Sequence, residues 1–66
     1  MASLFYRLDG IKRKMLFTHS AYNDNGIVYT IYRLEGTWKY VVKLNGVFAK
    51  VIDGLKAAKR FGRSAK

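Results

Sequence analysis

The chain has 66 residues and a formal net charge of +9, because it carries 13 Lys and Arg but only four Asp and Glu. This length allows one small domain. Half of the residues are hydrophobic, which is enough for one core and argues against global disorder. The absence of cysteine excludes disulfides and cysteine-based zinc sites. No apolar run approaches the roughly 20 residues of a membrane span, so we expect a single soluble domain, 1–66, in the cytoplasm with no membrane contact.

The N-terminal third predicts two strands joined by a tight turn. Apolar and polar residues alternate from Leu4 to Leu8, and the Asp9-Gly10 pair that follows is typical of two-residue hairpin turns. A long strand is then expected from Ile11 to Tyr22. Its better core face comprises Met15, Phe17 and Ala21, with Arg13 and His19 at the same parity.

A third strand is expected from Ile27 to Leu34, after a loop over residues 23–26. Alternation points Ile27, Tyr29 and Ile31 inward. The outward side chains are then Val28, Thr30 and Tyr32. With Glu35-Gly36 as a two-residue turn, Tyr32 lies opposite Lys39 in the next strand.

The segment from Trp38 to Ile52 predicts a hairpin around Asn45-Gly46, which favours a type I′ turn because both residues tolerate φ > 0. The turn fixes the register, so Val42 faces Ala49 and Tyr40 faces Val51. The expected core face is Tyr40, Val42, Leu44, Val47, Ala49 and Val51. The other face is basic with apolar residues between the lysines: Lys39, Val41, Lys43, Phe48 and Lys50.

The period changes after residue 52, where Asp53 is the expected N-cap of a helix over about residues 54–62. At about 100° per residue, one side of this helix is apolar and comprises Leu55, Ala58, Phe61 and Ala65. The opposite arc holds Lys56, Lys59, Arg60, Arg63 and Lys66. Gly62 is expected to end the regular helix and leave a frayed basic tail over residues 63–66.

These elements predict a mainly β, α+β fold. Strands between about residues 4 and 52 form an antiparallel meander of three to five strands, either open or closed into a small barrel. The apolar side of the C-terminal helix packs on the core face of this sheet, and its basic side points to solvent.

The sequence predicts no catalytic residue, no metal, no cofactor and therefore no enzyme. The four acids have local backbone roles, three in expected turns and one at the helix start: Asp9, Asp24, Glu35 and Asp53. None is left for a pair of catalytic carboxylates. His19 is the only histidine, and a zinc or catalytic site needs partners that the chain lacks. The six glycines are spread over separate turns and form no phosphate-binding loop.

Two sets of side chains favour a polyanionic partner, of which nucleic acid is the commonest. The outward sheet face places two rings among lysines, which suits base stacking with phosphate contact, and equally suits an ordinary solvated face. A third alternative is that the sheet curls into a small barrel and Phe48 is partly covered. The helix arc holds cations and no acid, which favours phosphates. The candidate nucleic-acid-binding residues are Tyr32, Lys39, Lys43, Phe48, Lys50, Lys56, Lys59, Arg60 and Arg63. A secondary basic run, which would extend a phosphate track, comprises Lys12, Arg13 and Lys14.

From about Ile27 onward the order is strand, turn, Trp-Lys-Tyr-Val-Val-Lys-Leu-Asn-Gly, strand and then Leu-Lys-Ala-Ala-Lys-Arg-Phe. This order resembles small DNA-binding modules with a three-stranded sheet and a helix, at the N-termini of phage and transposon integrases and in AP2-type domains. The resemblance implies that the sheet enters the major groove. In size, charge and element order the chain is also similar to tiny archaeal chromatin proteins, and it looks like a small phage-encoded protein.

We therefore expect a small basic protein that binds nucleic acid, with double-stranded DNA favoured over RNA, as a monomer or weak dimer. The alternative is a phage-encoded interaction or inhibitor protein that binds an acidic surface of a host protein. A phage-encoded protein of either kind would act in the bacterial cytoplasm or nucleoid.

Overall fold

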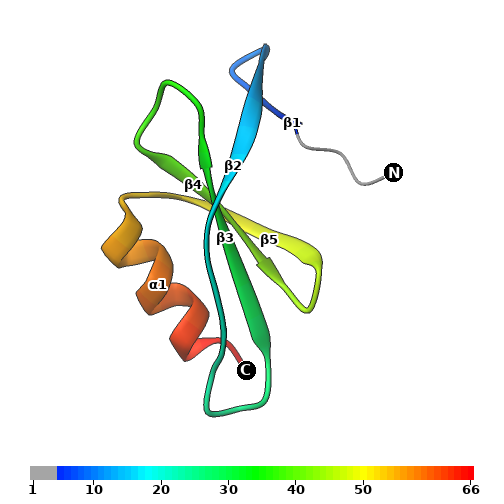
Figure 1. The fold of residues 1–66 in the computed structure, drawn as a ribbon, viewed down its shortest axis with the longest axis vertical. Coiled ribbons are helices and arrows are strands. Elements are labelled where there is room, and N and C mark those ends of the chain that lie inside the picture. Colours follow the sequence, from blue (N-terminus) through cyan, green and yellow to red (C-terminus); the bar gives the residue numbers. More distant parts are fainter. Residues whose placement is uncertain (1–4) are drawn as a thin grey trace.

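The computed structural model describes residues 5–66, in which five strands form one antiparallel sheet in chain order and a helix follows the last strand (Figure 1). The elements are β1 (Phe5–Leu8), β2 (Ile11–Tyr22), β3 (Val28–Leu34), β4 (Lys39–Leu44), β5 (Val47–Asp53) and α1 (Leu55–Ser64). The predicted fold class, a mainly β meander with one C-terminal helix, is confirmed. Leu4, the expected start of the first strand, lies outside the described residues.

Two tight turns hold the outer hairpins of the sheet, as predicted. Asp9 (φ 51°) and Gly10 (φ 77°) join β1 to β2, and Asn45 (φ 51°) and Gly46 (φ 82°) join β4 to β5. Positive φ at both central residues is the mark of the type I′ turn, whose twist matches that of the flanking strands. Asn45 also ties its turn to β3, because its amide donates to the carbonyl of Val28 at 2.8 Å.

A bulge at Thr18 exchanges the two faces of β2 partway along the strand. Residues up to Phe17 and residues from His19 onward pair with β3 in different registers. One extra residue moves every later side chain to the other face of the sheet. The expected common face of Met15, Phe17 and Ala21 is therefore wrong. Met15 is buried on the face opposite the helix, Ala21 packs on the helix side, and Phe17 is 65% exposed.

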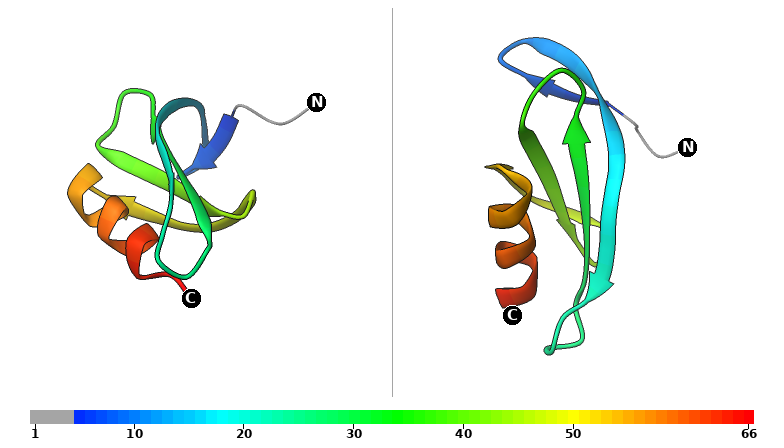
Figure 2. Two further views of the ribbon diagram at one scale, coloured as in Figure 1. Left: turned by 60° about the horizontal axis from the view of Figure 1, so that its bottom comes forward. Right: turned by 60° about the vertical axis from the view of Figure 1, so that its left-hand side comes forward.

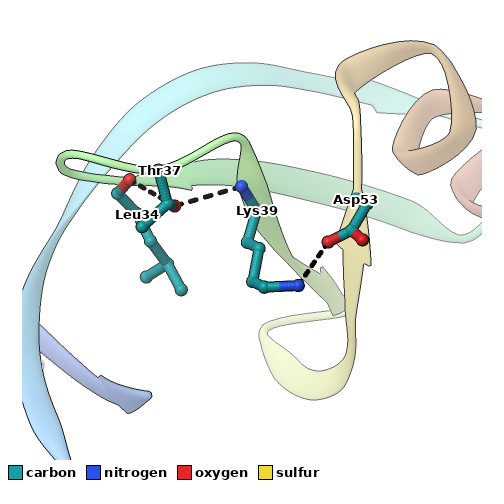
Figure 3. A network of polar contacts seen from close by, with 4 residues as sticks. All are labelled: Leu34, Thr37, Lys39 and Asp53. Carbon is teal, nitrogen blue, oxygen red and sulfur yellow. Dashed lines mark hydrogen bonds and ion pairs between the residues drawn. The ribbon is translucent and has the colours of Figure 1, made fainter. Parts of the chain in front are cut away.

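The connection between β3 and β4 is a four-residue loop, not the expected two-residue turn. Tyr32 therefore lies opposite Val41 instead of Lys39. Thr37 closes the loop, because its hydroxyl donates to the carbonyl of Leu34 at 2.8 Å and accepts from the amide of Lys39 at 3.0 Å (Figure 3). The register differs from the prediction by two residues, an even number, so the side chains keep their predicted faces.

A second bulge, at Ala49, changes the faces along β5. The register predicted next to the turn is confirmed, but beyond it Val42 lies opposite Lys50 rather than Ala49. Lys50 therefore lies on the helix side and Val51 on the opposite face, which reverses both predictions. Val47, expected in the core, is exposed at the edge of the sheet.

Each face of the sheet carries its own hydrophobic cluster. The cluster under α1 comprises Tyr29, Ile31, Tyr40, Val42 and Ala58. The cluster on the other face comprises Met15, Leu34 and Val41, with Tyr6 and Leu8 of β1 packed against it. The sheet curls around this second cluster (Figure 2). Tyr6 stacks on Phe48 of β5 with ring centroids 5.6 Å apart. The result is a half-barrel whose edge strands meet through side chains.

The helix begins after Gly54 and has no aspartate cap. Asp53 is the last residue of β5, where it pairs with Lys39 in the ladder. Gly54 is the N-cap at φ 87°, a left-handed conformation that glycine adopts without steric cost, and no side chain caps the first turn. The predicted N-cap is therefore wrong, because the aspartate still belongs to the strand.

The C-terminal end of α1 is fixed by packing and by asparagine side chains. Gly62 lies inside the helix and is buried against Tyr29, and the helix continues to Ser64. Asn23, in the loop between β2 and β3, donates through Nδ2 to the carbonyls of Gly62 at 2.9 Å and Ala65 at 2.8 Å. The expected helix end at Gly62 and frayed tail from residue 63 are thus wrong. Glycine is needed there because no side chain fits against the tyrosine ring.

Candidate nucleic-acid interface

The solvent side of α1 carries cations and no acid. Its apolar side packs on the sheet as predicted, which turns the opposite side outward. On that side Lys56, Arg60, Arg63 and Ser64 line a shallow, open hollow, and Lys59 is half-buried in the same helix. We call the four cations Lys56, Lys59, Arg60 and Arg63 the helix face.

The positive charge of the helix face is uncompensated. Within residues 5–66, its four side chains form no ion pair and no hydrogen bond. Lys56 lies one helical turn from Lys59 and Arg60, and Arg63 lies one turn from the same two residues. Like charges at these spacings destabilise an isolated helix by about 0.2–0.5 kcal/mol per pair. A polyanion bound across this surface would relieve that repulsion.

On the opposite face of the sheet, a row of side chains crosses four neighbouring strands. Phe17 of β2 meets Tyr32 of β3 edge-on, with ring centroids 6.1 Å apart. Lys43 of β4 places its Nζ 5.5 Å from the centre of the Tyr32 ring, and Phe48 of β5 is its register partner. We call these four side chains the aromatic row. It contains three of the predicted sheet-face residues and one, Phe17, that the sequence placed in the core.

Lys39 lies on the same face of β4 but has a carboxylate partner. Its Nζ is 2.6 Å from Oδ1 of Asp53 on the neighbouring strand (Figure 3). The hydrogen bond and the charge of Asp53 raise the pKa of Lys39 above its ordinary value. The carboxylate already offsets the charge of Lys39, so this lysine is less available to an external anion than the sequence predicts.

Lys50 belongs to the other side of the sheet. The bulge at Ala49 directs it toward α1, where its Nζ lies 5.7 Å from the centre of the Phe61 ring. The predicted five-residue sheet face is therefore divided. Tyr32, Lys43 and Phe48 stay together, Lys39 is paired, and Lys50 lies at the flank of the helix.

The basic run at the start of β2 is also divided. Arg13 is half-buried and donates from Nη1 to the carbonyl of Glu35 at 3.0 Å, so it supports the loop between β3 and β4. Lys12 lies over the ring of Phe5, with Nζ 4.6 Å from its centre. Lys14 is exposed. Successive residues of a strand point to opposite faces, so these three do not form one continuous cationic surface.

Residues that could bind a metal do not gather in the described part of the chain, since no group of three His, Asp or Glu side chains comes together in residues 5–66. His19 lies beside Tyr29 on the helix side, with ring centroids 5.7 Å apart. No helix in this part of the chain is long and apolar enough to span a membrane.

The sequence does not predict that Phe17 is exposed or that Tyr6 is the residue that partly covers Phe48. Phe17 keeps the face of Met15 that alternation predicts, because the bulge at Thr18 comes after it, but on that face its ring is 65% exposed. The contact between Tyr6 and Phe48 joins the two edge strands, so it depends on the curl of the whole sheet. Comparison with protein-family models, curated proteins and solved structures finds no match for the chain.

Proposed function

We propose that the protein binds nucleic acid, with double-stranded DNA as its preferred partner, and that the helix face contacts the phosphate backbone. The observation that carries the proposal is the single sign of this face. Four cations lie on one side of a ten-residue helix that contains no acid, and none of them has a carboxylate partner in residues 5–66.

The net charge of +9 supports the same proposal, because a net positive protein attracts a polyanion and gains free energy when the polyanion's counterions are released. Solubility alone does not require it, since ordinary soluble surfaces mix both signs. An anionic membrane is a poorer partner. The apolar side of α1, which a membrane-bound helix would insert, is already packed on the sheet.

The architecture limits how one duplex can be contacted. The helix face and the aromatic row lie on opposite sides of the sheet, so a single straight segment of DNA cannot contact both. We therefore assign duplex binding to the helix face, with Lys50 at its flank, and not to the combined helix and sheet surface that the sequence suggests.

A salt series of binding isotherms on a random-sequence duplex tests the proposal. Arg60→Ala should make the negative slope of log K against log salt concentration shallower by about 0.9, the value for one lost phosphate contact. Lys12→Ala, which removes the same charge from the β1–β2 hairpin, is the matched control and should leave the slope unchanged. Absence of binding by the parent at ~50 mM salt would contradict the proposal and favour an acidic protein as the partner.

A further inference from the structure

The aromatic row lies on the side of the sheet away from the helix face, so duplex DNA bound to α1 does not reach it. We infer that the aromatic row is a second binding site and that it takes the unpaired bases of single-stranded DNA. The inference rests on the proposed function for the class of partner, a nucleic acid, but it concerns a different face and a different kind of contact.

Two rings of the aromatic row are exposed to solvent although the hydrophobic cluster on this face is already filled. Phe17 is 65% exposed, although Met15 and Leu34 already fill the cluster on this face. Phe48 is 49% exposed, although Tyr6 covers one side of its ring. Two phenyl rings open to solvent on the same face form an apolar surface, and a flat apolar group of a partner would cover it.

The polar groups beside these rings suit a nucleotide. Lys43 lies between Tyr32 and Phe48 in the row, and its ammonium group has no carboxylate partner in the described residues. It is placed to contact a phosphate while bases stack on the neighbouring rings. The hydroxyls of Ser20 and Thr30, 3.3 Å apart, continue the same face, with Thr30 opposite Lys43. They offer hydrogen bonds to base edges or sugar.

The curvature of the sheet favours unpaired bases over a duplex. Stacking of Tyr6 on Phe48 draws β1 and β5 together, so this face is concave (Figure 2). The major groove admits a narrow, convex element such as a helix or a two-stranded ribbon. Base faces are hidden within a duplex, whereas unpaired bases offer them to aromatic side chains.

The test measures binding of labelled oligo(dT), labelled oligo(U) and a labelled random duplex to the parent and to single variants. Phe17→Ala removes the most exposed ring of the row. Phe17→Leu keeps the apolar contact with Tyr32 but loses the flat ring. Trp38→Ala is the matched control, because Trp38 is an aromatic residue that is 79% exposed in the loop between β3 and β4, outside the row. Thermal melting confirms that each variant is folded.

Phe17→Ala is expected to weaken oligo(dT) binding roughly 5- to 150-fold, the range for one lost base stack, with little change in the salt slope. Phe17→Leu should lose most of the same affinity, whereas Trp38→Ala should lose none. Duplex binding should be the same for all three variants and the parent, because the row does not contact the duplex.

Unchanged oligo(dT) binding in Phe17→Ala, or an equal loss in Trp38→Ala, would overturn the inference. Tighter binding of oligo(U) than of oligo(dT) would overturn the assignment to DNA. A parent protein that binds the duplex but not oligo(dT) refutes the second site and leaves the proposed function intact. A parent that binds oligo(dT) through Phe17 but does not bind the duplex refutes the helix-face proposal alone.

Discussion

The helix face and the aromatic row lie on opposite sides of one sheet and differ in composition. The helix face has four cations and no ring, whereas the row has three rings and one cation. Charge contacts release counterions and weaken steeply with salt, and stacking contacts change little. Binding to the two faces should therefore be separable by its salt dependence. A single affinity measured at one salt concentration would not distinguish them.

The two faces also depend on different parts of the fold. The helix face requires that one helix be docked tightly on β3 and β4, and the row requires the correct register in the β4–β5 hairpin. A substitution can therefore damage one face while the other is kept.

Gly62→Ala should loosen the helix face most strongly. A Cβ at this position would lie 2.5 Å from Cγ and 2.9 Å from Cβ of Tyr29, atoms near the backbone that cannot move aside easily. We expect a loss of about 3 kcal/mol of folding stability, at the upper end for overpacking, which corresponds to roughly 12–24 °C in Tm. Thermal melting measures it.

Whether Gly62→Ala lowers or raises folding stability shows whether the helix packs closely on Tyr29. In an exposed helix position, alanine is more stable than glycine by about 1 kcal/mol. Ala57→Gly, at an exposed position of the same helix, is the matched control and should cost about that amount from propensity alone. A Gly62→Ala protein more stable than the parent would show that the helix does not pack closely on Tyr29.

Gly46→Val should disturb the aromatic row by straining the turn that sets its register. The type I′ turn holds Gly46 at φ 82°, a conformation that a β-branched residue resists at a cost of about 2 kcal/mol. We expect a lower Tm and weaker oligo(dT) binding, because Lys43 and Phe48 are register partners beside this turn. An unchanged melting temperature would count against the hairpin geometry described here.

Asn23→Ala should loosen only the last turn of α1. The variant loses two hydrogen bonds from Nδ2 to helix carbonyls and two that Oδ1 accepts from the amides of Asn25 and Ile27. We expect a loss of about 1.5 kcal/mol in folding stability, with weaker duplex binding as Arg63 becomes less ordered. Asn25→Ala, which removes one such bond to Ala65, should cost less. Equal costs would argue that Asn23 does not hold the helix end.

Asp53→Asn should have the smallest effect on stability, because the ion pair to Lys39 is largely exposed. Asp53 raises the pKa of Lys39, so the lysine's share of this stabilisation is present at neutral pH and is lost as the pH rises through that raised value. The variant should strengthen oligo(dT) binding and steepen its salt slope by about 0.7, since Lys39 becomes free to contact a phosphate. Asp24→Asn, with the same change in net charge, is the control; an equal gain there would mean that net charge alone matters.

The sequence predicted the elements well because their signals are local. Asp9-Gly10 and Asn45-Gly46 have the residue types that type I′ turns need, and the 3.6-residue period of Leu55, Ala58 and Phe61 oriented the helix. The cations of α1 were accordingly expected on the solvent side, where they lie. A loop two residues longer than expected between β3 and β4 left the faces unchanged, because two is an even shift.

The row was predicted only in part because bulges insert one residue each. The extra residues, Thr18 and Ala49, have no sequence mark that distinguishes them from regular strand residues, yet each reverses the faces that follow. The bulge at Ala49 moves Lys50 off the predicted outward face, and the bulge at Thr18 separates Ala21 from Met15. Phe17 precedes the bulge and keeps its predicted face, but it is exposed there. The role of Gly62 also depends on Tyr29, 33 positions earlier in the chain, which a local capping rule cannot include.

If the two faces bind two kinds of nucleic acid, the protein should bind a duplex and a single strand at the same time, and a competition titration measures this. Labelled oligo(dT) is titrated into the protein alone and into the protein saturated with unlabelled duplex at ~0.15 M salt, where the Debye length of about 8 Å is shorter than the 10–12 Å diameter of a helix. Separate faces predict nearly equal affinities in the two titrations and a ternary complex of both nucleic acids. Displacement of oligo(dT) by the duplex, with affinity falling in proportion to duplex concentration, would show that both compete for one surface and would contradict the account.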